Sequence, residues 1–160
     1  MYNRLQKFKN LESYTCFLWG PRQSGKSTLV KKLFPKSPYY DLLLSDEFNR
    51  LTLEPYLLRQ ELISKKSKMP IIIDEVQKIP ILLDEIQWLI VNKGFQFILL
   101  GSSARKLKRG RANLLGGRAL RYELFPLVSK EIPDFDLIRA LNHGLIPTHY
   151  EANNPKILLK

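Results

Sequence analysis

The chain has 160 residues, of which 44% are hydrophobic and 26% are charged. A single domain of this length buries roughly 70% of its unfolded surface, so it needs no disulfide or structural metal for stability. Cys16 is the only cysteine, which excludes an internal disulfide, and its apolar neighbours favour a buried thiol. Residues 1–10 are too polar for a signal peptide, and no run reaches the ~18 apolar residues of a membrane span. We therefore expect a cytoplasmic protein without a membrane partner.

The net charge is +11, from 26 Lys and Arg against 15 Asp and Glu. Such an excess favours polyanion partners, either nucleotide phosphates or nucleic acid, although many Lys-rich chains are merely soluble. The excess is concentrated in residues 105–121, which contain no acid. This basic segment has no aromatic residue before Tyr122 on which bases could stack. A nucleic-acid surface, a source of arginines acting on a second copy of the chain, and a solvated loop all remain open.

Apolar runs alternate with longer amphipathic segments, which predicts an α/β fold with helices covering a parallel sheet. Pro and Gly residues mark the ends of several segments. In chain order, the expected elements are a strand at 15–19, a helix at 25–34, a weaker strand at 39–44, a helical turn within 46–53, a helix at 54–66, a strand at 69–74, a helix at 81–92, a strand at 95–100, a short helix and basic loop within 106–117, a strand at 119–124 and a helix at 129–142.

The strongest motif is Gly20-Pro21-Arg22-Gln23-Ser24-Gly25-Lys26-Ser27, which fits G-x-x-x-x-G-K-[ST] between an expected strand and an expected helix. In this context, backbone N–H groups and the helix N-terminus surround phosphate oxygens. Lys26 would reach the β- and γ-phosphates of ATP, and the Ser27 hydroxyl would bind Mg²⁺. Thr28 would support the α-phosphate side. The motif predicts a P-loop that binds Mg·ATP.

Two acids follow the apolar run 71–73, namely Asp74 and Glu75. The end of a parallel strand lies at the edge of the sheet where open α/β folds bind ligands. We expect Asp74 to hold Mg²⁺ through water, and Glu75 to orient and polarise the water that attacks the γ-phosphorus. An Asp-Glu pair by itself commonly caps the next helix. Together with the P-loop, it indicates hydrolysis of the nucleotide.

A third strand ends in small polar residues, Gly101, Ser102 and Ser103. Either serine hydroxyl could hydrogen-bond the attacking water or the γ-phosphate at the same edge of the sheet. A Gly-Ser turn selected for its backbone conformation is the alternative.

These motifs resemble the AAA+ ATPases of bacteria and archaea that carry a C-terminal domain of unknown function. The resemblance covers residues 5–147 and rests on the P-loop, IIIDEVQKIP, LLGSSARKL and GGRALRYELFPL. It implies a P-loop NTPase core of five parallel strands in AAA+ order. It also implies a base pocket near residues 5–11, places Gln77 at the family's position, and makes Arg118 a candidate for a γ-phosphate or interdomain contact.

The resemblance further implies that residues 1–147 form the ATPase domain and that 148–160 begin another region. We identify no helical lid with a sensor arginine, so turnover is expected to be weak. Two alternatives to an ATPase stay open. One is a nucleic-acid-associated module that ATP switches through residues 105–121, and the other is a truncated, non-catalytic remnant.

Overall fold

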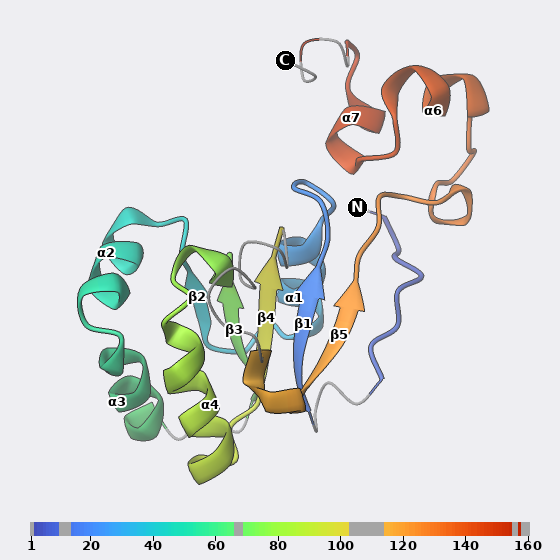
Figure 1. The fold of residues 1–160 in the computed structure, drawn as a ribbon. Coiled ribbons are helices and arrows are strands. Elements are labelled where there is room, and N and C mark those ends of the chain that lie inside the picture. Colours follow the sequence, from blue (N-terminus) through green and yellow to red (C-terminus); the bar gives the residue numbers. More distant parts are fainter. Residues whose placement is uncertain (1, 10–13, 66–68, 103–113, 155–156, 158–160) are drawn as a thin grey trace.

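Five short apolar runs form one sheet in the computed structural model, which describes residues 2–9, 14–65, 69–102, 114–154 and 157 (Figure 1). The strands are β1 (Thr15–Trp19), β2 (Tyr39–Asp41), β3 (Ile71–Asp74), β4 (Phe97–Gly101) and β5 (Ala119–Glu123). Their order is β2-β3-β4-β1-β5, and each neighbouring pair is parallel. The predicted five-stranded parallel sheet of an α/β P-loop NTPase fold is therefore confirmed.

The central strands are buried on both faces, which explains why they appear in the sequence as continuous apolar runs. Phe17 and Trp19 of β1 point into one core cluster, while Cys16 and Leu18 point into the other. This division follows from the alternation of side chains along a strand. Burial of Cys16 raises its pKa to about 12, so the thiol stays protonated at neutral pH.

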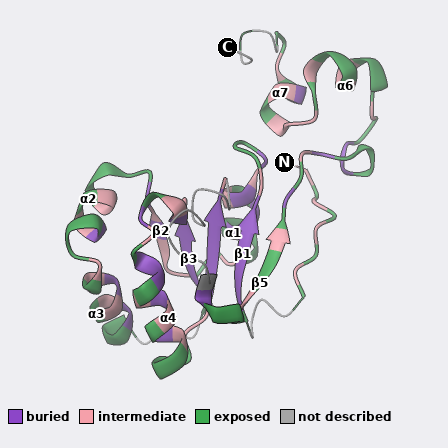
Figure 2. Cartoon of the chain, in the orientation of Figure 1, coloured by how far each residue is buried: buried purple, intermediate pink, exposed green. Residues whose placement is uncertain are grey.

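Helices cover both faces of the sheet (Figure 1). α1 (Lys26–Leu33) contributes Leu29 and Val30 to the cluster that contains Cys16. The opposite face is covered by α2 (Ser45–Leu53), α3 (Tyr56–Lys65) and α4 (Leu82–Lys93), whose leucines belong to the same core cluster as Phe17 and Trp19. In Figure 2 the central strands are accordingly purple, and the outer sides of these helices are green.

The sequence prediction of a helix over residues 129–142 is wrong. The structure has a short 3₁₀ helix η3 (Ser129–Glu131), an irregular stretch, and then α6 (Leu137–His143). Pro133 has no N–H to donate to a helix, and Asp134 takes a left-handed φ of 49°. Asp136 then caps α6 by accepting a hydrogen bond from the backbone N–H of Arg139 at 3.0 Å.

Smaller differences occur elsewhere. α2 is a nine-residue helix where only a helical turn was expected, and its Arg50 binds Glu47 on the same helix and Glu61 on α3. β2 ends at Asp41 rather than at residue 44. Just after the strand, the Asp41 carboxylate accepts a hydrogen bond from the Leu43 N–H at 3.0 Å.

A small unit follows β5 and contains η3, α6 and α7 (Pro147–Glu151). Leu127, Ile132 and Tyr150 form its buried cluster, and Tyr2 from the start of the chain packs against them. The expected domain boundary between residues 147 and 148 falls inside α7, and the assignment of 148–160 to a further region stays a prediction. Within the described ranges, no helix is both long and apolar enough to span a membrane.

Candidate functional site

The P-loop lies between β1 and α1 at the carboxyl edge of the sheet. A side chain at Gly20 would place its Cβ 2.2 Å from the carbonyl oxygen of Leu124, so only glycine fits there. Gly25 has a φ of 89°, and Gln23 takes a left-handed φ of 62°. The Ser24 hydroxyl, which is buried, donates to the Pro21 carbonyl at 2.9 Å. The loop is thus folded back on itself, with Pro21, Arg22 and Gln23 exposed at its tip.

Lys26 is enclosed by this loop and is only 5% exposed. Its ammonium donates to the carbonyl oxygens of Gly20 and Pro21, each at 2.8 Å. Burial lowers the pKa of Lys26, whereas the nearby Glu75 and Asp74 carboxylates act in the opposite direction. The cation is therefore held at the centre of the loop by weak neutral acceptors, which phosphate oxygens can replace.

Ser27 and Asp74 are joined directly. The Ser27 hydroxyl donates to Oδ2 of Asp74 at 2.5 Å, and the hydroxyl of Tyr39 donates to the same oxygen. Burial, followed by the contact with Asp74, raises the pKa of Tyr39, so its phenol remains a donor at neutral pH. The sequence alone favours packing for the Tyr39-Tyr40 pair, so this contact with Asp74 was not predicted.

The oxygens of Ser27 and Asp74 suit a magnesium ion that is bound mainly by phosphate. Among the described residues, no group of three or more His, Cys, Asp or Glu side chains is placed to hold a metal. Mg²⁺ needs no such cage, because it keeps several waters and uses one or two protein oxygens together with substrate phosphates. The Ser27 hydroxyl and the Asp74 carboxylate supply that chemistry.

Glu75, Gln77 and Ser102 form a second polar group at the same edge. Glu75 has a left-handed φ of 58° and immediately precedes the 3₁₀ helix η1 (Val76–Lys78). The Gln77 amide donates both to Oε2 of Glu75 and, at 3.3 Å, to the Ser102 hydroxyl. A Cβ at Gly101 would lie 2.6 Å from the Gln77 amide oxygen, so glycine makes room for this side chain. Gln77 thereby links two predicted site residues, whereas Ser103 lies outside the described residues.

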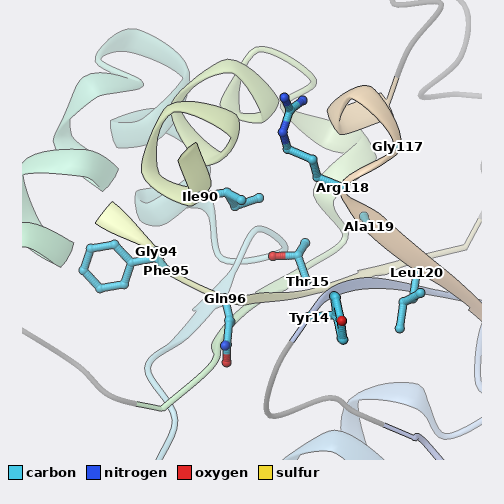
Figure 3. A pocket seen from close by; sticks show the side chains of 10 residues that line it. All are labelled: Tyr14, Thr15, Ile90, Gly94, Phe95, Gln96, Gly117, Arg118, Ala119 and Leu120. Atoms are coloured by element: carbon cyan, nitrogen blue, oxygen red, sulfur yellow. The ribbon is translucent and has the colours of Figure 1, made fainter. Parts of the chain in front are cut away.

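Arg118 lies at the opposite edge of the sheet. It follows η2 (Leu114–Gly117) and precedes β5, and the pairing of Thr15 with Ala119 puts both residues at the amino ends of their strands. Five residues of strand separate the two edges by roughly 15 Å. Figure 3 shows Arg118 beside Gly117, at a separate cavity of about 420 Å³ that Tyr14 also lines. The structure therefore does not bring Arg118 to the P-loop of its own chain. A contact with another domain or with a second copy of the chain stays a prediction for this residue.

A cavity of about 520 Å³ adjoins the P-loop at Ser24 and Gly25. One wall is a side of α1 that runs from Thr28 to Leu33. A second wall is the extended N-terminal segment 2–9, and a third is formed by Pro147 and Glu151 of α7. The base pocket was expected near residues 5–11. The N-terminal residues that line this cavity are Tyr2, Asn3, Arg4 and Gln6, while Leu5 and Lys7 line a different one, and the place of the base stays a prediction.

Arg4 fixes the N-terminal segment in place. Its guanidinium binds the Glu131 carboxylate at 3.2 Å and donates to the carbonyl oxygen of Ser24 in the P-loop at 3.0 Å. The side chains of Arg4 and Glu131 are nearly buried, at 8% and 4% exposure respectively. Glu131 also accepts the Leu5 N–H at 2.6 Å. The ion pair joins the N-terminal segment, the P-loop and the small C-terminal unit.

Arg4→Ala is expected to destabilise the fold by about 3 kcal/mol, because it leaves a buried carboxylate without its cation. Chemical denaturation of the two proteins measures this difference. Lys9→Ala, which removes an exposed cation from the same segment, is the control and should change stability by less than about 0.5 kcal/mol. Equal effects of the two substitutions would contradict the anchoring role of Arg4.

The tip of the P-loop also contacts the C-terminal unit. Thr148 of α7 donates a hydrogen bond to the side-chain oxygen of Gln23 at 2.6 Å. No local pattern in the sequence indicates this contact, because 125 positions separate the two residues. Only the fold brings them together.

Comparison with known families gives one match. A family model described as "AAA domain" matches residues 12–133, a range that includes the P-loop, the acids after β3 and all five strands. A search of curated proteins finds no match to the chain. Since the matched range covers more than half of the sequence, the chain belongs to the AAA domain family of P-loop ATPases.

Proposed function

We propose that this chain binds ATP together with Mg²⁺ and hydrolyses it to drive or report a conformational change. The family and the fold are those of nucleotide-binding P-loop ATPases. The observation that carries the proposal is the convergence of Lys26, the Ser27–Asp74 pair and the Glu75–Gln77–Ser102 group at one edge of the sheet. Any one of these three features could serve only to stabilise the fold. Nucleotide binding and hydrolysis explain why all three lie together.

Binding would begin with the phosphates replacing the Gly20 and Pro21 carbonyls around the Lys26 ammonium. The N–H groups of the P-loop and the start of α1 add partial positive charge at the same place. Bound Mg²⁺ would supply neutralisation of charge between the β- and γ-phosphates. Ser27 would contribute its hydroxyl oxygen to the metal, and Asp74 would bind it through water. The base would enter the cavity between α1, residues 2–6 and α7.

Glu75 is the candidate general base for the attacking water. Its carboxylate accepts a hydrogen bond from the Gln77 amide through Oε2, and this contact orients the side chain. Ser102, joined to the same amide, would bind the water or the γ-phosphate. Because the Gln77 amide binds both Glu75 and the Ser102 hydroxyl, it would hold these two side chains at a fixed separation. Such positioning favours in-line attack of water on the γ-phosphorus.

The proposal has a direct test on the unmodified protein. Calorimetric titration with ATP should show saturable binding at one site, tighter when MgCl₂ is present. Release of inorganic phosphate should depend on Mg²⁺ and should stop when the metal is chelated. Binding without phosphate release would favour a nucleotide-binding, non-catalytic domain. The absence of binding in both solutions would overturn the proposal.

The nucleic-acid alternative has no support from the described contacts. The basic segment 105–121 is described only from residue 114 onward. Self-association through arginines acting on a second copy stays a prediction for Arg118.

A further inference from the structure

Tyr39 opens β2 and contacts the predicted metal ligands from the neighbouring strand. In the parallel register Tyr39 pairs with Ile72, and Asp74 lies two residues further along β3 on the same face. This geometry brings the phenol hydroxyl to Oδ2 of Asp74, the oxygen that also accepts the Ser27 hydroxyl. Two O–H donors from different elements therefore converge on one carboxylate oxygen.

The ring of Tyr39 is held in place by its surroundings. It packs against the core cluster under α1, and the Lys31 ammonium lies 4.1 Å from the ring centroid. Such a cation–π contact fixes the ring from the solvent side. Both contacts hold the ring in the position from which its hydroxyl donates to Asp74.

We propose that Tyr39 is a positioning residue that orients the Asp74 carboxylate for Mg·ATP, an inference that rests on the proposed function. A neutral donor holds a carboxylate without cancelling its charge, whereas a Lys or Arg at this place would compete with the metal. Both hydroxyls bind Oδ2, so neither engages Oδ1, and that oxygen is left to accept hydrogen bonds from metal-bound water. Without Tyr39 the carboxylate retains the Ser27 contact alone and can rotate about its terminal bond.

The role predicts an effect on the metal complex and not on the nucleotide alone. Asp74 acts on ATP through Mg²⁺, so a disordered Asp74 weakens Mg·ATP binding but leaves metal-free ATP binding unchanged. A residue that merely supported the P-loop would weaken both equally. Re-ordering the freed carboxylate on binding would cost part of the contribution of one hydrogen bond to a charged group, which corresponds to roughly a 5- to 10-fold change in affinity.

The matched control is the adjacent tyrosine. Tyr40 belongs to the same strand but points to the opposite face, where its hydroxyl donates to Glu61 at 3.1 Å. Tyr40→Phe removes the same atom from β2 on the face of the sheet that Tyr39 does not occupy. Tyr39→Phe keeps the ring and the Lys31 contact, so both variants are expected to fold, which circular dichroism checks.

The experiment is calorimetric titration of wild type, Tyr39→Phe and Tyr40→Phe with ATP, once with MgCl₂ and once with EDTA. We expect Tyr39→Phe to weaken Mg·ATP binding 5- to 10-fold with no change in EDTA, and Tyr40→Phe to change neither. Equal affinities of Tyr39→Phe and wild type for Mg·ATP would overturn the inference while leaving the proposed function intact. An equal loss in both solutions would also overturn it. Failure of the wild type itself to bind would instead remove the proposed function, and the inference with it.

Discussion

Replacement of Lys26 by alanine is expected to abolish measurable binding of Mg·ATP. The ammonium is the cation enclosed by the P-loop, and its present partners are two backbone carbonyls. Phosphate oxygens would form stronger, charge-assisted hydrogen bonds with it, each contributing about 1.5–3 kcal/mol. Loss of two such bonds corresponds to an affinity decrease of about a hundredfold or more. Calorimetry with Mg·ATP measures the difference.

Lys36→Ala is the matched control for charge. Lys36 is exposed beyond the far end of α1, so its removal changes the net charge equally but leaves the P-loop intact. Lys26→Met keeps the length of the side chain and tests whether any loss reflects an altered loop. Retention of wild-type affinity by both Lys26 variants would contradict the assignment of the phosphate site.

Glu75→Gln is expected to retain Mg·ATP binding and to lower turnover on the order of 10²-fold or more. The amide has the shape of the carboxylate, and its oxygen can still accept the hydrogen bond from Gln77. It cannot accept a proton from water at neutral pH. Phosphate release under saturating ATP measures the rate, and calorimetry confirms that the site is filled.

Glu54→Gln serves as the control, because Glu54 is an exposed carboxylate at the end of α2. It should leave the rate unchanged. A Glu75→Gln protein with wild-type turnover would move the general base to another residue. A variant that lost binding as well as turnover would assign Glu75 to the architecture of the site.

The sequence predicted those parts of the fold that depend on local patterns. β1 was predicted to the residue, because an apolar run between polar segments has few other structures open to it. The P-loop motif and the acids after β3 could be recognised in the sequence because the spacing of a motif is a local property. Because the strands are parallel, the residues that follow β1, β3 and β4 were expected at one edge of the sheet.

Contacts between distant segments could not be predicted in this way. The hydroxyl of Tyr39 reaches Asp74 only through the register of β2 on β3, and Thr148 reaches Gln23 only through the docking of α7. The prediction of one continuous helix over residues 129–142 was wrong because Pro133 interrupts it. Arg118 lies away from the P-loop of its own chain for a topological reason, and its role toward a second copy stays a prediction. A residue that precedes a parallel strand lies at the edge opposite the P-loop, whatever its motif suggests.

The Arg4–Glu131 pair has a consequence for the order in which the protein is assembled during synthesis. Its partners are separated by 127 positions, so residue 4 leaves the ribosome long before residue 131 exists. Contacts this distant in sequence form late, because loop closure costs entropy before any contact compensates for it. The wall formed by residues 2–6 must therefore wait for the C-terminal unit. A nascent chain released before residue 131 would contain every residue of the P-loop and the Ser24 carbonyl that Arg4 contacts, but not the carboxylate that pairs with Arg4.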